Sequence, residues 1–99
     1  MTNLTPTICP LCVKQANVFG TLNFQRQEAI RCEACGEFAI SDQARKRITG
    51  LPIQFKDDWR AKIKATDAQE IFLLTVRPVG AGGQIEEERV HRRNIQPLP

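Results

Sequence analysis

The stretch CPLC at residues 9–12 is followed, after a nineteen-residue spacer, by CEACG at residues 32–36. A gap of two residues lets both sulfurs of a pair turn toward one ion, while the backbone N–H groups of the tight turn point at the thiolates. Two such turns form the tetrahedral four-sulfur cage that Zn²⁺ prefers, and this cage leaves no open position for a substrate. The sequence therefore predicts one structural metal site, whose ligands are Cys9, Cys12, Cys32 and Cys35.

The residues around the cysteines suit two tight turns, with one exception. Pro10 fixes the backbone early in the first turn, and Gly36 follows the second pair at a position that often requires positive φ. Val13 occupies the equivalent position after the first pair, where glycine is also expected. We predict that Val13 either carries a local strain of about 1 kcal/mol or adopts different dihedral angles.

The two cysteine turns and their spacer resemble a zinc ribbon, in which two knuckles clamp zinc at the base of a small antiparallel sheet. The resemblance covers roughly residues 8–40. The following EFAIS at residues 37–41 and the helical pattern after it resemble, more loosely, the N-terminal ribbons of small uncharacterised bacterial and phage proteins. The resemblance implies a fold and a Zn²⁺ ion, since ribbons occur in transcription factors, polymerase subunits, ribosomal proteins and protein adaptors.

Disulfide formation and iron binding are alternatives to zinc for these cysteines. The start of the chain, MTNLTPTIC, lacks the basic head and apolar stretch of a secretory signal, so we expect a cytoplasmic protein in which disulfides are disfavoured. A rubredoxin-like iron electron carrier uses the same paired spacing. Rubredoxins carry glycine after both pairs and tyrosine in the core, whereas this chain has Val13 and no tyrosine. Iron is therefore the less favoured metal.

Length and charge set limits on the function. A chain of 99 residues with 41% hydrophobic and 25% charged residues is typical of one globular unit. No apolar run approaches the length of about 20 residues that a membrane span requires.

The formal net charge is +3 with neutral thiols. Four thiolates and one divalent ion together subtract two charges, which leaves +1. Nucleic-acid contact is permitted by this balance but not required by it.

The predicted fold is a small α+β protein with a zinc ribbon of three short antiparallel strands over residues 1–40. Residues 41–99 are predicted to form an extension of two helices and a C-terminal strand or hairpin, packed on the ribbon as a single compact unit. Short apolar segments near residues 18–19, 22–24 and 29–30 suit a hairpin, and residues 38–40 suit a third strand.

Two helices are predicted after the ribbon. Ser41 is a typical N-cap, and the side chains of Ile40, Ala44 and Ile48 repeat at a spacing of four before Gly50 and Pro52 end the first helix. The second helix is predicted from near Gln54 to Ala65. Its expected core stripe is Phe55, Trp59 and Ile63, and an ion pair is expected between Asp58 and Lys62.

The C-terminal third is less regular. The segment IFLLTVRPV at residues 71–79 favours a buried strand slightly over a helix, although Thr66 and Gln69 form a possible capping box for a helix. The segment GAGG at residues 80–83 predicts a chain reversal. The remainder carries an acidic block at residues 86–88 and His91, for which we predict an exposed side chain.

No nucleophile motif, carboxylate pair or open metal position is evident, so we expect a protein without catalytic activity. The favoured function is a zinc-binding interaction module for a protein or nucleoprotein partner, and the resemblance suggests a phage-encoded adaptor or inhibitor. The first alternative is nucleic-acid binding. A homodimer through the 71–77 segment is a further possibility if that strand is left uncovered. Candidate partner-binding cations are Arg45, Lys46, Arg47, Lys56, Arg60 and Lys64.

Overall fold

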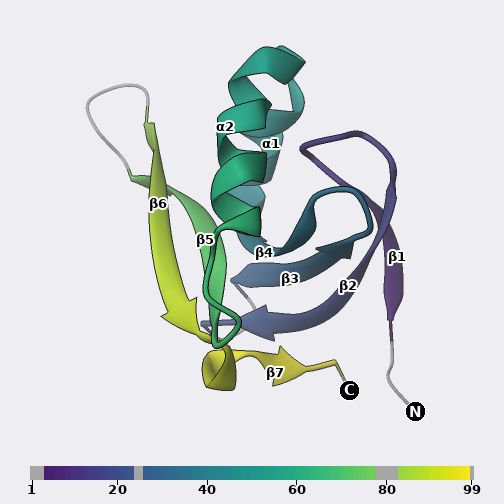
Figure 1. The fold of residues 1–99 in the computed structure, drawn as a ribbon, viewed down its shortest axis with the longest axis vertical. Helices are drawn as coiled ribbons and strands as arrows, with labels where there is room; N and C mark the ends of the chain where they lie inside the picture. The colour runs from purple at the N-terminus through teal and green to yellow at the C-terminus, as the bar shows by residue number, and fades with distance from the viewer. Residues whose placement is uncertain (1–3, 24–25, 78–82, 99) are drawn as a thin grey trace.

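The computed structural model describes residues 4–23, 26–77 and 83–98, and in these ranges the strands form one mixed sheet (Figure 1). The strand order is β1-β2-β3-β4-β5-β6, and β7 pairs with β2. The elements are β1 (Thr5–Ile8), β2 (Gln15–Leu22), β3 (Gln27–Cys32), β4 (Gly36–Ser41), α1 (Asp42–Thr49), α2 (Ile53–Lys64), β5 (Glu70–Arg77), β6 (Gln84–His91), η1 (Arg92–Asn94) and β7 (Gln96–Pro97).

The predicted division into a ribbon followed by helices and a separate C-terminal strand or hairpin is wrong. Strands β1 to β4 are antiparallel neighbours, but β4 also pairs in parallel with β5, so the strands at both ends of the chain share one sheet. The two helices form the crossover between β4 and β5. The sheet is continuous because β5 buries residues 71–74 on both of its faces, and such a strand needs partners along both edges.

The segment at residues 71–77 is a strand, as predicted. It lies inside the sheet, with β4 along one edge and β6 along the other. The predicted homodimer requires a free edge on this strand. Pairing with β6 along residues 70–77 and with β4 along residues 72–74 leaves little of that edge, and the homodimer stays a prediction.

The first helix confirms its sequence prediction. The Ser41 hydroxyl accepts a hydrogen bond from the backbone N–H of Ala44 at 3.2 Å, which caps α1. Ala44 and Ile48 are buried, as is Ile40 in the preceding strand. The spacing of four therefore identified the face of α1 that packs on the sheet.

The second helix forms where predicted, but its buried face differs from the predicted stripe. Ile63 is buried and Trp59 is partly buried, whereas 58% of Phe55 is exposed. Each residue turns an α-helix by about 100°, so a spacing of four drifts by about 40° per step and a spacing of seven returns to within about 20°. Lys56, seven residues before Ile63, is accordingly buried in place of Phe55.

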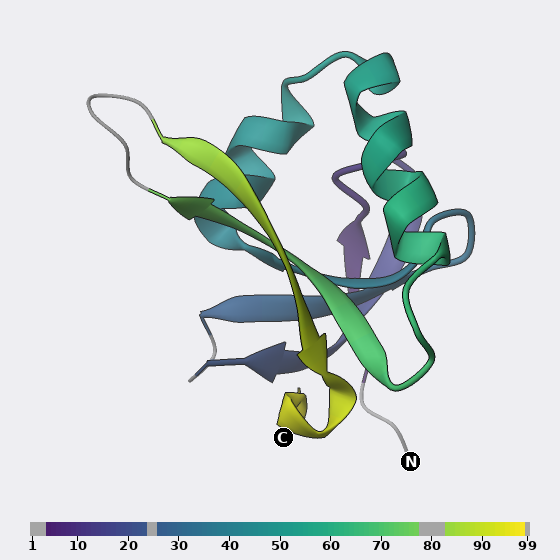
Figure 2. The ribbon, with the colours of Figure 1, turned by 60° about the vertical axis from the view of Figure 1, so that its left-hand side comes forward.

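The helices lie together over one face of the sheet, as Figures 1 and 2 show from two directions. Phe38 and Phe72 of the sheet pack with Ile48 and Ile63 of the helices in the main core. A second, smaller core lies on the other face. Its buried members are Leu22, Ala29, Ala39, Ile71 and Leu73.

The C-terminal segment crosses to the start of the sheet. After β6, η1 leads into β7, which pairs with β2 through Gly20 and Thr21 (Figure 1). Ile95 packs against the second core. A Cβ at Gly20 would lie 2.6 Å from Ile95 Cγ2 and 2.7 Å from the Gln96 carbonyl oxygen. Glycine at position 20 thus permits the close approach of the two backbones.

Substitution of Gly20 by alanine is expected to destabilise the fold by about 1–3 kcal/mol, because the added methyl group meets backbone atoms that cannot move independently. Chemical denaturation of the metal-loaded protein measures this change. Gly50→Ala is the matched control, since its Cβ would meet nothing within 4 Å. Equal unfolding midpoints for the two variants would show that the C-terminal segment moves away from the added methyl group without a loss of stability.

Two further sequence predictions concern the chain reversal at residues 80–83 and the exposure of His91. Most of the predicted reversal at 80–83 lies outside the described residues, and only Gly83 is included, with a φ of 154°. His91 is exposed, and its Nδ1 accepts a hydrogen bond from the Arg93 backbone N–H at 3.0 Å. Neither helix in the described ranges has the length and apolarity that a membrane crossing requires.

Candidate metal centre

The sheet brings the two cysteine pairs together at one end. Cys9 follows β1 and Cys12 lies in the turn before β2, while Cys32 ends β3 and Cys35 lies in the turn before β4. Because β2 and β3 are antiparallel, the start of β2 lies beside the end of β3. The two turns therefore meet although nineteen residues separate them.

The four sulfurs form one compact cluster. All four Sγ atoms lie within 4.8 Å of one another. The separation is 3.8 Å between the sulfurs of Cys9 and Cys35 and 3.4 Å between those of Cys12 and Cys32. These pairs join the two turns, so the cluster depends on both.

This arrangement fits a tetrahedral metal ion. A Zn–S distance of about 2.3 Å gives sulfur–sulfur edges of about 3.8 Å in a regular tetrahedron, and this length lies within the range of 3.4 to 4.8 Å found among the four sulfurs. Four sulfur donors also suit zinc and iron better than magnesium or calcium, which prefer oxygen. The four cysteines are thus positioned to bind a metal ion.

Burial and backbone hydrogen bonds act on the thiols in opposite directions. Burial raises the pKa of Cys9 to about 11, although the backbone N–H groups of Leu11 and Cys12 oppose this shift. Burial also raises the pKa of Cys35, and the nearby charge of Cys9 adds to that effect. Burial disfavours the Cys12 thiolate as well, but the Lys14 N–H and the neighbouring sulfurs outweigh it, so its pKa is lowered.

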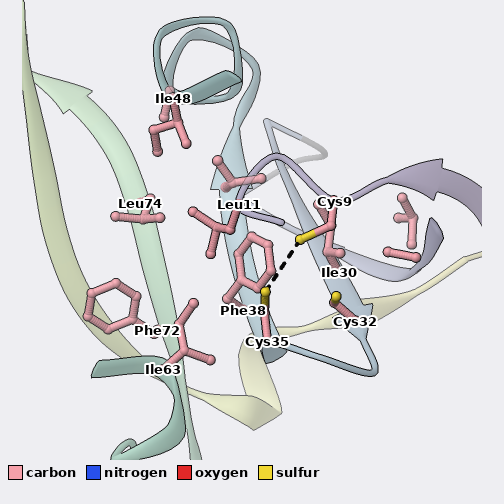
Figure 3. Close-up of a cluster of buried hydrophobic side chains, with 14 residues drawn as sticks. Cys9, Leu11, Ile30, Cys32, Cys35, Phe38, Ile48, Ile63, Phe72 and Leu74 are labelled. Atoms are coloured by element: carbon pink, nitrogen blue, oxygen red, sulfur yellow. Dashed lines mark hydrogen bonds between the residues drawn. The ribbon is translucent and has the colours of Figure 1, made fainter. Parts of the chain in front are cut away.

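The metal centre is continuous with the main core. Cys9 and Cys35 are fully buried, and Leu11 of the first turn points into the space beside Phe38 (Figure 3). Cys12 is the most exposed of the four cysteines. The sulfurs of Cys9 and Cys35 therefore lie on the core side of the metal centre, and Cys12 lies nearer the surface.

Both turns have the positive φ expected after a cysteine pair. Gly36 has a φ of 99°, and Val13 has a φ of 60°. The Val13 N–H donates to the Cys9 carbonyl at 2.9 Å, which closes the first turn. The valine side chain is 62% exposed, so little packing offsets its unfavourable backbone conformation.

Val13→Gly is expected to stabilise the metal-loaded protein by about 1 kcal/mol, because glycine adopts positive φ without a Cβ clash. Thermal melting in the presence of excess zinc measures the gain. Val13→Ala serves as the control, since it retains a Cβ and should gain less. A lower melting temperature for Val13→Gly would contradict the assignment of strain.

Arg60, one of the predicted partner-binding cations, lies at the edge of the metal centre. The charge of the Cys35 thiolate and its hydrogen bonding raise the pKa of Arg60. The Arg60 Nε atom is buried and has no hydrogen-bond partner within the described residues, while one terminal nitrogen lies 3.4 Å from Asp57. A cation here offsets the negative charge of a four-thiolate site.

Arg60→Gln is expected to weaken zinc binding about tenfold, which is the lower end of the effect of second-shell changes on metal affinity. Competition with a chromophoric chelator measures the affinity. Lys64→Gln, one turn further along α2 and exposed, is the matched control. Equal affinities for the two variants would show that Arg60 has no influence on the metal.

The other predicted cations do not form one continuous row. Lys56, Arg60 and Lys64 are spaced four residues apart in α2, but Lys56 is buried, so the three do not form a continuous exposed row. Arg45 contacts Glu28 at 3.3 Å, and Lys46 contacts Asp42 at 3.2 Å. Arg47 donates a hydrogen bond to the Gly83 carbonyl at 2.8 Å. The cations are evident in the sequence, but their acidic partners are not, because a partner such as Glu28 lies seventeen positions from Arg45 along the chain.

The fold and the site define a protein with one mixed sheet, a two-helix crossover and a four-cysteine cluster positioned to bind a metal. No protein-family model, curated protein or solved structure matches the chain. The resemblance to zinc ribbons therefore rests on the cysteine spacing and on the geometry of the four sulfurs.

Proposed function

We propose that this protein is a non-enzymatic zinc-binding interaction module that binds a protein or nucleoprotein partner. The observation that carries the proposal is the cluster of four cysteine sulfurs, all within 4.8 Å of one another. Zinc is the proposed metal because it has a tetrahedral preference, has no redox chemistry and is commonly bound by four cysteines. A structural ion of this kind stabilises the surface that the surrounding strands and helices present.

The absence of a catalytic role is supported by the ligand set. When four protein thiolates bind one tetrahedral ion, no position remains for water or substrate. Catalytic zinc sites instead use three protein ligands and keep the fourth position open. The cluster therefore favours a structural role for the ion.

A protein partner is supported by exposed apolar side chains. Ile53 and Phe55 at the start of α2 each expose 58% of their surface, and Leu51 exposes 37%. Neighbouring exposed apolar groups mark surfaces that associate with other molecules. The cations favour a nucleic-acid partner less, because Arg45, Lys46 and Arg60 each lie within 4 Å of a carboxylate.

The metal is tested by substitution with Co²⁺. A four-sulfur tetrahedral site should give intense visible d–d absorption and sulfur-to-cobalt charge transfer at one equivalent, and Zn²⁺ should displace the cobalt. Weak absorption, typical of octahedral oxygen coordination, would contradict the proposed ligands. Iron in the protein as isolated would instead favour the rubredoxin-like alternative.

The partner is tested by affinity capture from the native host with the zinc-loaded protein, followed by identification of the retained molecules. We expect a protein or a nucleoprotein complex, and we expect it to be lost from the chelator-treated control. Fluorescence anisotropy with single- and double-stranded nucleic acids at low salt examines the alternative. Tight binding that weakens steeply with salt, in the absence of a retained protein, would favour the nucleic-acid function.

A further inference from the structure

An apolar groove of about 400 Å³ lies between α2 and β6. We name it the α2–β6 groove. Its lining residues are Leu51, Gln54, Phe55, Asp58, Trp59 and Glu87. Phe55 is mostly exposed, and Trp59, four residues further along α2, donates its indole N–H to Glu87 of β6 at 2.9 Å. The groove thus joins aromatic surface to the edge of the sheet.

Strand β6 forms that edge. It pairs with β5 over all eight of its residues, and no strand in the described ranges pairs with its other side. Figures 1 and 2 show β6 as the outermost strand on the side of the sheet opposite β1. The outer edge of such a strand presents backbone N–H and C=O groups that can pair with an extended segment of another protein.

The acidic block of β6 is divided between the two faces of the sheet. Ile85 packs with the core beneath the helices, and Glu87 contacts Lys62 of α2 at 2.8 Å. Val90 packs with the second core on the opposite face. Because side chains alternate along a strand, Glu86 and Glu88 lie on the face away from the helices. Neither carboxylate has an ion-pair partner in the described residues.

We propose that β6 and the α2–β6 groove bind an extended basic segment of a protein partner. The segment adds to the outer edge of β6, with basic, apolar and basic residues opposite Glu86, Glu87 and Glu88. The two basic side chains lie beside unpaired carboxylates, and opposite charges at facing positions stabilise a strand pair. The apolar side chain enters the groove against Phe55. This inference rests on the proposed function and specifies its partner.

The charges favour a different protein over a second copy of this chain. Antiparallel pairing of two β6 strands over their full length would place Glu87 opposite Glu88 twice and Glu86 opposite Arg89 twice, so the copies would gain no net attraction from charge. Like charges at directly opposite positions are destabilising. A basic segment meets the same edge with charges of the opposite sign.

The experiment selects peptides from a displayed library of random ten-residue sequences on the immobilised, zinc-loaded full chain. We expect enriched peptides to contain an apolar residue between two basic residues, and we expect a bound synthetic version to slow amide hydrogen exchange in residues 84–91. Failure to enrich any peptide, enrichment without this pattern, or unchanged exchange in β6 would overturn the proposal.

Variants locate the binding site of the selected peptide. The double variant Glu86→Lys/Glu88→Lys and the single variant Phe55→Ser should each weaken binding at least tenfold. The controls are Glu28→Lys on β3 and Ile8→Ser on β1, because Glu28 is solvent-accessible and Ile8 is 56% exposed, similar to Phe55. Equal losses in the controls, or no loss in the β6 and groove variants, would exclude this surface.

The outcomes separate this inference from the proposed function. A chain that holds its zinc and retains a partner, but binds no basic peptide at β6, has the proposed function with a different docking surface. A chain that binds no metal fails the proposed function before any peptide is added.

Discussion

Replacement of Cys35 by serine is expected to abolish tight zinc binding and to remove the cooperative thermal transition of the protein. Cys35 is fully buried and its sulfur lies 3.8 Å from that of Cys9, so the variant loses one of four ligands at the inner side of the site. Zinc binding contributes on the order of 10 kcal/mol or more to small modules of this kind. Few domains retain their fold after a loss of that size.

The matched control for Cys35→Ser is Ala34→Ser, which introduces the same hydroxyl group one residue earlier and leaves all four sulfurs in place. Circular dichroism melting and zinc content should be close to those of the unaltered protein for Ala34→Ser. A Cys35→Ser protein with an unchanged melt would show that the cluster contributes nothing to stability.

Zinc affinity is expected to fall by at least about 100-fold for each unit that the pH is lowered between pH 8.5 and pH 6.5. Burial raises the pKa of Cys9 to about 11 and also raises that of Cys35. Both thiols are therefore protonated in this range without metal, and each must release a proton when it binds the ion. These two protons set the minimum dependence, which chelator competition at several pH values measures.

The metal-loaded protein is expected to lose stability as the pH falls, because its thiolate ligands take up protons when the ion is released. Zinc affinity that stays constant from pH 6.5 to 8.5 would contradict the protonated state of the buried thiols.

The local features near the cysteines could be predicted from the sequence because each depends on a few adjacent residues. The paired spacing located the four sulfurs, Ser41 located the start of α1, and the positive φ of Gly36 followed from its place after a cysteine pair. The apolar run at residues 71–74 identified a buried strand. These are short-range signals of backbone geometry and burial.

The continuity of the sheet could not be predicted in the same way. Pairing of β4 with β5 joins segments on either side of two helices. The local sequence of a buried strand does not indicate which other strands it pairs with. Strands β1 and β7 were not predicted, since both are short and contain proline, Pro6 and Pro97. In β6, Ile85 and Val90 are five residues apart and so lie on opposite faces of the sheet. The sequence of β6 therefore lacks the alternation of apolar and polar residues that identifies a strand.

The difference between the predicted and observed faces of α2 has a related cause. A spacing of four in α2 suggested one stripe of core residues and one row of cations, but the helix buries Lys56 and exposes Phe55. Arg60 lies near Cys35, a contact between residues 25 positions apart in the sequence. Long aliphatic stems allow lysine and arginine to be buried in part, so charge alone does not define an exposed face.

Metal content is the most direct test of the account. Protein purified under reducing conditions, without added metal, should contain one zinc ion per chain by elemental mass spectrometry, and removal of that ion by a chelator should abolish the cooperative melt. Protein that contains neither zinc nor iron and still unfolds cooperatively would contradict the claim that four cysteine thiolates share one metal ion.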